Sequence, residues 1–122
     1  MVKLPVAMLV ATLHITPVHA DDLANKGQKL AEANCSGCHV VDDSNKFGGI
    51  ASTPSFRVLV RGLTDWRTRF ETFHVRLPHQ SVIRIKGTDP LTEGPPTTHQ
   101  VFIELDDIDA LVAYAETFVK EN

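Results

Sequence analysis

The sequence has little excess charge, few aromatic residues and only two cysteines. Its 122 residues carry 12 Lys and Arg against 15 Asp and Glu, a formal net charge of −3. Because general nucleic-acid binders are usually basic, this class of protein is disfavoured. No apolar run reaches the roughly 20 residues that a membrane-spanning helix needs. Two cysteines suffice for one disulfide or one two-thiol site, which excludes a scaffold built on several disulfides.

Methionine is also scarce, since both methionines lie within the first eight residues. The beginning of the chain has the layout of a secretory signal peptide: Lys3 precedes an apolar stretch over residues 4–13, and compact residues lead up to Ala20. We therefore expect residues 1–20 to be a signal peptide cleaved after Ala20. Residues 21–122 would then form one exported, periplasmic domain that contains no methionine.

Three segments show the 3.6-residue apolar period of an amphipathic helix, and Pro, Gly, Asn and Asp gather between them. We expect helices over residues 21–34, 63–75 and 107–120. We expect loops over residues 40–56 and 79–101, the second with a short extended piece at Val82, Ile83 and Ile85. The pattern predicts a domain of three main helices with long loops.

The motif that carries chemistry is Cys35-Ser36-Gly37-Cys38-His39. It is a C-x-x-C-H sequence, the attachment sequence for c-type haem. Two thiols three positions apart can add to the two vinyl groups at one edge of a porphyrin, and His39 then lies under the iron as its axial ligand. Covalent attachment suits an exported protein that could otherwise lose its cofactor. The motif therefore predicts one covalently bound haem c.

Three other interpretations of the two cysteines compete with haem attachment. A thioredoxin-like dithiol lies between a strand and a helix, whereas here a helix precedes the motif. A zinc site would combine both thiols with His74 and His79, but 35 residues separate Cys38 from His74, far more than in a zinc finger. A plain disulfide would close a very small ring and leave His39 without a role.

With this motif in place, the sequence resembles the class I c-type cytochromes over most of residues 22–120. Gly27, eight residues before the first cysteine, matches the glycine at which the first and last helices of that family cross. Leu111 and Tyr114 match the apolar and aromatic pair that packs against the crossing. Ala31 departs from the family, which usually has an aromatic residue there. The resemblance implies an all-α, cytochrome c-like fold around one covalently bound haem.

The resemblance also assigns residues around the haem. Thr53-Pro54-Ser55-Phe56 is similar to the family segment whose proline carbonyl accepts the ring N–H of the proximal histidine. Pro54 would therefore fix the ring and the tautomer of His39. Apart from the resemblance, Trp66 is interpreted as a haem-binding residue that contacts the propionates, with core packing as the alternative. Three arginines are interpreted as propionate or surface contacts, with a purely solvated position as the alternative: Arg57, Arg61 and Arg84.

The family's second axial ligand, a methionine after the third helix, is missing from the mature chain. In a short loop its place would fall near Val82, which cannot bind iron. In a longer loop the place falls on His99, which we favour narrowly over His79. Lys86 is a weaker candidate, a vacant or water-filled position is a further alternative, and His74 is expected to pack on a helix.

The second ligand decides the expected function. Two histidines suit electron transfer, at a potential below that of a His/Met site, whereas an open position would bind CO, NO or peroxide. The resemblance implies a one-electron carrier and not an enzyme. The alternatives are a small-ligand-binding or sensing haem protein and a haem subunit of a larger redox enzyme.

Charge is unevenly distributed along the chain. Residues 57–86 contain seven Lys and Arg against two acids, whereas residues 104–121 contain six acids against Lys120. The two blocks are either two solvated faces or, for the basic one, a patch for haem propionates or for an acidic protein. We expect the partners to be redox proteins that dock electrostatically.

Overall fold

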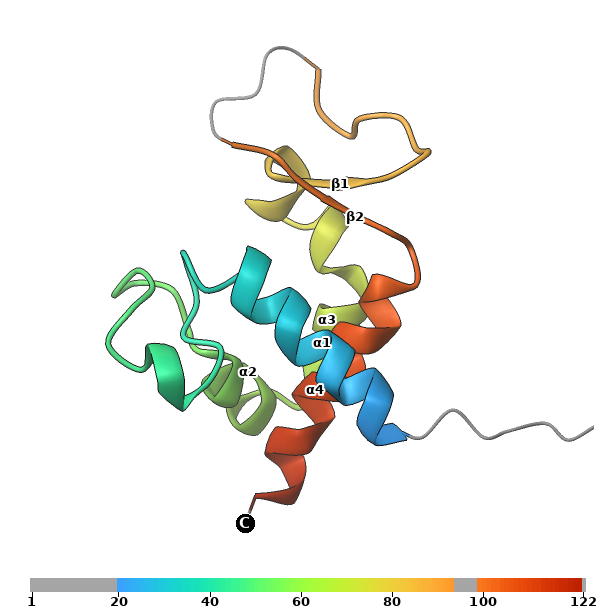
Figure 1. Ribbon diagram of the computed structural model, residues 1–122. Coiled ribbons are helices and arrows are strands. Elements are labelled where there is room, and N and C mark those ends of the chain that lie inside the picture. Colours follow the sequence, from blue (N-terminus) through green and yellow to red (C-terminus); the bar gives the residue numbers. More distant parts are fainter. Residues whose placement is uncertain (1–19, 94–98, 122) are drawn as a thin grey trace, which may run out of the picture.

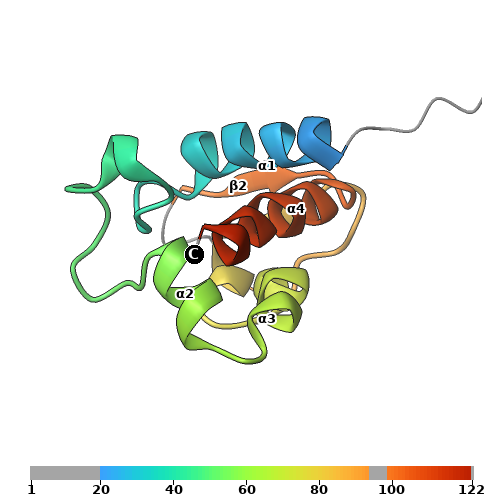
Figure 2. The ribbon, with the colours of Figure 1, turned by 90° about the horizontal axis from the view of Figure 1, so that it is seen from below.

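Four α-helices form the body of the protein. The computed structural model describes residues 20–93 and 99–121. The helices are α1 (Ala20–Asn34), α2 (Phe56–Gly62), α3 (Trp66–Thr72) and α4 (Asp107–Lys120). α4 lies between α1 on one side and α2 and α3 on the other (Figure 1, Figure 2). The predicted all-α fold is confirmed, and α1 and α4 are the first and last of the predicted helices.

α1 and α4 cross in close contact at Gly27. A Cβ atom on Gly27 would lie 1.9 Å from the carbonyl oxygen of Ala110 and 2.8 Å from the Cβ of Tyr114. Only a hydrogen atom fits at this position, so glycine is what allows the two helices to touch. Ala31, one turn further along α1, is fully buried. The close crossing that the sequence predicted at Gly27 is confirmed.

The main hydrophobic core surrounds α4. Its aromatic rings meet edge to face: Phe56 and Phe70 lie 5.0 Å apart between ring centroids, and Tyr114 and Phe118 lie 5.2 Å apart. Such pairs contribute beyond the area that they bury. The buried members of this core are Ala31, Val41, Phe56, Val60, Phe70, Leu111, Val112, Tyr114, Ala115 and Phe118. Because they come from α1, α2, α3 and α4 and from the loop after α1, one core fixes all these elements relative to one another.

The helix predicted over residues 63–75 begins later in the structure, at Trp66, and a helix that the sequence did not predict precedes it. A separate helix, α2, starts at Phe56, where Ser55 caps it by accepting a hydrogen bond from the N–H of Val58 (3.1 Å). α2 ends at Gly62, because Leu63 is extended. α3 then starts at Trp66 and continues as a 3₁₀ turn over Phe73–Val75.

Two short strands stand beside the helices. β1 (Ile83–Ile85) pairs in parallel with β2 (Val101–Ile103), with Ile83 opposite Val101. The sequence predicted the extended piece but not its partner. A second buried cluster of Ile83, Ile103 and Ile108 joins this ladder to the beginning of α4. The ladder therefore fixes the chain that follows the 3₁₀ turn His79–Ser81 against the helical body.

The predicted signal peptide lies almost wholly outside the described residues, which begin at Ala20, the first residue of α1. Within residues 20–93 and 99–121, no helix combines the length and the hydropathy that a membrane crossing requires.

Tyr114 fastens α4 to the loop that follows α1. Its buried hydroxyl donates a 2.8 Å hydrogen bond to the carbonyl of Val41, which is also buried. Replacing Tyr114 with phenylalanine leaves that carbonyl without a partner, so we expect the free energy of unfolding at pH 7 to fall by about 1–3 kcal/mol. Guanidinium unfolding followed by far-UV circular dichroism measures this loss.

The same variant tests a pH effect. Burial, and then the nearby carboxylates of Asp42 and Glu32, raises the pKa of Tyr114. Above about pH 10 the unfolded chain releases this proton while the folded chain keeps it, so the stability of the wild type falls as pH rises. The difference in the free energy of unfolding between the wild type and Tyr114→Phe should therefore become smaller above pH 10, by less than about 1.4 kcal/mol per pH unit. A difference in the free energy of unfolding that stays constant up to about pH 11 would contradict the inference that the folded protein keeps this hydroxyl buried and protonated.

Candidate functional site

The C-x-x-C-H motif continues the last turn of α1. The N–H groups of Cys35 and Ser36 both donate to the carbonyl of Ala31, at 2.8 and 3.1 Å. The N–H groups of Cys38 and His39 then donate to the carbonyl of Cys35, at 3.1 and 2.9 Å. These turns place both thiols and the imidazole at one end of α1. The motif therefore follows a helix, unlike the dithiol of a thioredoxin-like protein.

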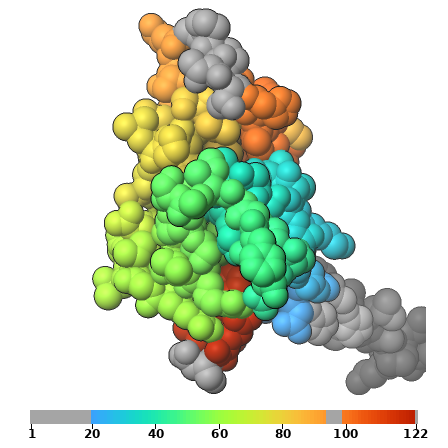
Figure 3. Space-filling model, turned by 90° about the vertical axis from the view of Figure 1, so that its left-hand side faces the viewer, coloured from blue at the N-terminus to red at the C-terminus, as the bar shows by residue number. Residues whose placement is uncertain are grey.

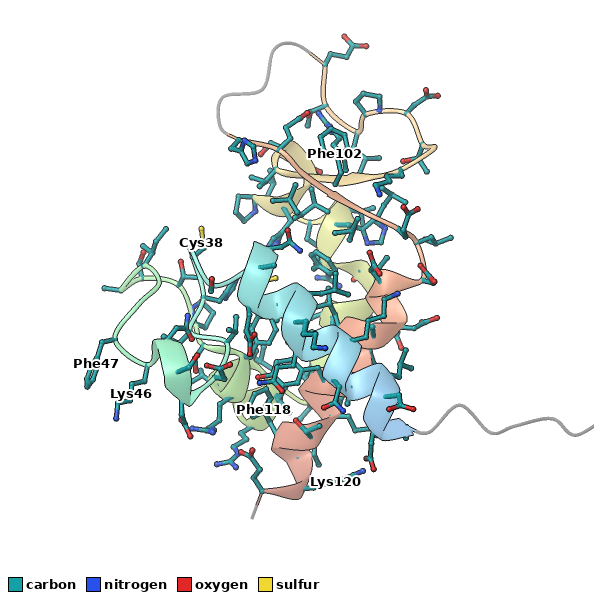
Figure 4. All side chains as sticks on the ribbon, viewed as in Figure 1. Cys38, Lys46, Phe47, Phe102, Phe118 and Lys120 are labelled. Atoms are coloured by element: carbon teal, nitrogen blue, oxygen red, sulfur yellow. The ribbon has the colours of Figure 1, made fainter. Side chains whose placement is uncertain are left out.

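The two thiols are free and lie in different environments. Cys35 packs against the main core, and burial, followed by the charge of Cys38, raises the pKa of its thiol to about 12. Cys38 is exposed, with its sulfur at the surface beyond the carboxyl end of α1 (Figure 4). No cluster of three or more His, Cys, Asp or Glu that could hold a metal ion occurs in the part of the chain that the structure describes.

His39 is fixed by a backbone carbonyl. Its Nδ1 lies 2.7 Å from the carbonyl oxygen of Pro54, which can only accept, so Nδ1 carries the proton and donates. The N–H of Phe56 donates to the carbonyl of Val40 (3.0 Å), which holds the two segments together. The Phe56 ring also meets the His39 ring edge to face at 5.6 Å. This leaves Nε2 of His39 unprotonated and able to ligate a metal.

Asn45 supports this arrangement, although it is not among the site residues predicted from the sequence. Its Oδ1 accepts from the N–H groups of Val41 (2.9 Å) and Asp42 (3.2 Å), and its Nδ2 donates to the carbonyls of His39 (3.0 Å) and Ser36 (3.4 Å). Asp42 in turn caps the 3₁₀ turn Asp43–Asn45. The signal available in the sequence was the spacing of Asp42 and Asn45, which is that of a capping box.

His79 lies opposite His39. The planes of the two imidazole rings are parallel within 8°, and their centroids are 6.0 Å apart. Burial, and then the charge of His39, lowers the pKa of His79. On this side of the molecule the segment around residue 80 (yellow) lies above the loop that follows His39 (green) (Figure 3). The structure thus brings together two histidines that are 40 positions apart in the sequence.

The other candidates for a second ligand lie elsewhere. His99 is exposed, and Lys86 donates a 2.6 Å hydrogen bond to Glu104. The ring of His74 meets Phe73 edge to face at 5.9 Å. Val82 packs against the cluster beside the β-ladder. The narrow preference for His99 over His79 therefore has no support in the geometry.

A family model described as Cytochrome c matches residues 24–118. The chain belongs to the cytochrome c family. Comparison with curated proteins and with solved structures found no match. Family membership means that this cytochrome binds haem c covalently and works in electron transfer, as carriers of this family do.

The structure places Trp66 of the cytochrome at the beginning of α3. Its half-buried ring meets Phe70 at 6.2 Å, and the guanidinium of Arg67 lies 5.2 Å from its centroid. Phe70 packs on Phe56, which contacts His39. Trp66 is therefore connected to His39 through two intervening rings.

Most basic residues of the 57–86 block of the cytochrome are paired with carboxylates, several of them from the acidic 104–121 block. Five of the seven basic residues of the 57–86 block pair with carboxylates within 4 Å: Arg57 with Asp43 and Glu121, Arg61 with Glu121, Arg67 with Glu116, Arg69 with Asp65, and Lys86 with Glu104. Such exposed pairs contribute little stability. They do, however, offset the charge of both blocks. Arg76 and Arg84 have no such carboxylate within residues 20–93 and 99–121.

Proposed function

We propose that this chain is an exported, periplasmic cytochrome that carries one covalently bound haem c and transfers one electron at a time between redox proteins. The observation that carries the proposal is the arrangement of three side chains at the end of α1. There, Cys35 and Cys38 stand beside His39, whose Nδ1 is held 2.7 Å from the carbonyl of Pro54. That donor set fits the cofactor, because it offers two thiols for thioether bonds and one imidazole nitrogen for the iron.

Each residue has a distinct role in this proposal. Cys35 and Cys38 hold the haem covalently, and His39 is the proximal ligand. Pro54 keeps the imidazole in the tautomer that presents Nε2, which also raises the basicity of the ligand. Trp66 supports the haem-facing wall through Phe70. When bound, the haem supplies a couple that gains or loses one electron.

The partners we propose are redox proteins. An electrostatic dock would have to depend on Arg76 and Arg84, because the other basic residues of the 57–86 block are already paired with carboxylates. Arg76 donates to the Thr72 hydroxyl, and Arg84 donates to the Gln80 carbonyl. The two arginines flank His79 in the sequence. Association that weakens as salt is raised, and that weakens less in Arg76→Gln and Arg84→Gln, would support this dock.

The attachment experiment tests the proposed function. The full chain is expressed with a haem-attachment system in an exported compartment, and the mass of the mature chain is measured. We expect cleavage after Ala20 and one haem that survives denaturation, with reversible one-electron titration. The double variant Cys35→Ala/Cys38→Ala should lose the covalent haem completely.

Ser36→Ala is the matched control, because it removes a 2.6 Å hydrogen bond to the carbonyl of Glu32 in the same turn but leaves both thiols in place. It should keep its haem. A wild type without covalent haem, or a double variant that retains it through denaturation, would refute the proposed function.

A further inference from the structure

The distance between the two imidazoles matches a metal ion bound between them. Two metal–nitrogen bonds of about 2.0 Å, extended by the radii of the two rings, place the ring centroids roughly 6 Å apart. The His39 and His79 centroids are 6.0 Å apart, and the ring planes are within 8° of parallel. We propose that His79 is the second axial ligand, so that two imidazoles bind the haem iron from opposite sides. This inference rests on the proposed function.

The nitrogen atoms needed for this coordination are available. Nδ1 of His39 is engaged by Pro54, which leaves Nε2 for the metal. No hydrogen bond engages the ring of His79 within residues 20–93 and 99–121. A neutral imidazole nitrogen is a common metal ligand, and the two faces of one haem would use one nitrogen from each ring.

Packing holds His79 in place. The Phe73 ring stands perpendicular to the His79 ring at 5.5 Å, and Phe73 itself packs against both hydrophobic clusters. Phe73 is therefore a positioning residue for His79. It follows α3 directly, so the ligand is oriented by the helical body and not by a long loop.

The backbone around His79 is a series of short turns. The N–H and the hydroxyl of Ser81 donate to the carbonyl of Pro78, at 3.2 and 2.7 Å, and the N–H of Val82 donates to the carbonyl of His79 (2.9 Å). The N–H of Val101 then donates to the carbonyl of Val82 (2.9 Å), where the β-ladder begins. A ligand held in this way binds without the entropic penalty of ordering a loop.

The competing ligands are engaged or remote. The hydrogen bond and the charge of Glu104 raise the pKa of Lys86, which would have to lose its proton to ligate iron. His99 is exposed, and the described contacts do not join it to His39. With His79 bound, the iron has no open position for CO, so the electron-carrier function is favoured over ligand sensing.

The test uses the full exported chain with its haem attached, so that loss of attachment, which would refute the proposed function, is seen first and separately. The variants are His79→Ala, His79→Met and His99→Ala, the last as the matched control. Absorption and electron paramagnetic resonance spectra report the spin state, and CO is added to the ferrous protein.

We expect wild type and His99→Ala to be low-spin and inert to CO. His79→Ala should become high-spin and bind CO, and added imidazole should restore the low-spin spectrum. His79→Met should be low-spin with a potential above that of the wild type, because methionine ligation raises it.

Three results would overturn the assignment: a high-spin wild type that takes up CO, a spectrum of His79→Ala identical to that of the wild type, or a change from low-spin to high-spin iron in His99→Ala. If His79→Ala yields no haem protein, His79→Met decides, because its spectrum and potential must differ from those of the wild type.

Discussion

Replacing Gly27 with alanine should lower the free energy of unfolding by about 3 kcal/mol, since the added methyl would overlap the backbone of α4. Its Cβ would lie 1.9 Å from the Ala110 oxygen and 2.5 Å from the Ala110 carbonyl carbon, so α1 and α4 must move apart. The higher helix propensity of alanine offsets only about 1 kcal/mol of the cost of this overlap. Thermal unfolding of the holoprotein should show a midpoint lower by more than about 10 °C.

Gly62→Ala is the control for this prediction. Gly62 is the last residue of α2, and a Cβ there meets no atom within 4 Å. We expect this variant to match the wild type or to gain up to about 1 kcal/mol. Equal stability of Gly27→Ala and Gly62→Ala would show that the crossing tolerates a methyl group.

Replacing Asn45 with alanine should lower the free energy of unfolding by about 2–3 kcal/mol. The side chain makes four hydrogen bonds to backbone groups of the segment from Ser36 to Asp42. Each is worth about 1 kcal/mol, and water replaces part of the loss in this half-buried position. Guanidinium unfolding of the holoprotein measures the effect, with the haem absorption and circular dichroism as separate probes.

Two further variants separate the functions of the Asn45 side chain. Asn45→Asp keeps the acceptor for Val41 and Asp42 but puts a carboxylate oxygen against the carbonyls of His39 and Ser36, so it should lose at least as much stability as Asn45→Ala. Ser44→Ala removes only an exposed bond to Asp42 (2.6 Å) in the same turn, and should change stability by less than about 0.5 kcal/mol. A loss in Ser44→Ala equal to that in Asn45→Ala would contradict a specific role for Asn45.

Local patterns in the sequence predicted the parts of the molecule that depend on neighbours in the chain. The C-x-x-C-H motif is five consecutive residues, and α1 and α4 carry a helical apolar period over their whole length. Gly27 and Tyr114 could be assigned because the order of such residues resembles a known family. These features need no knowledge of distant contacts.

The parts that the sequence did not predict depend on contacts between distant segments. β1 becomes a strand because β2 pairs with it across a long intervening segment, and no local pattern shows that pairing. The choice between His79 and His99 has the same origin. Phe73 and the β-ladder place His79 opposite His39, whereas both histidines look alike as loop residues in the sequence.

Because of the β-ladder, the length of the segment over residues 87–100 should have little effect on the position of His79. The ladder fixes both ends of this segment: the Lys86 N–H donates to the Ile103 carbonyl at one end of the parallel ladder, and the Val101 N–H donates to the Val82 carbonyl at the other, both at 2.9 Å. Doubling such a closed segment adds only about 0.6 kcal/mol of closure entropy. His79 precedes the ladder, so an insertion between these ends would leave it in place. This segment is accordingly where a label or an affinity tag can enter the chain.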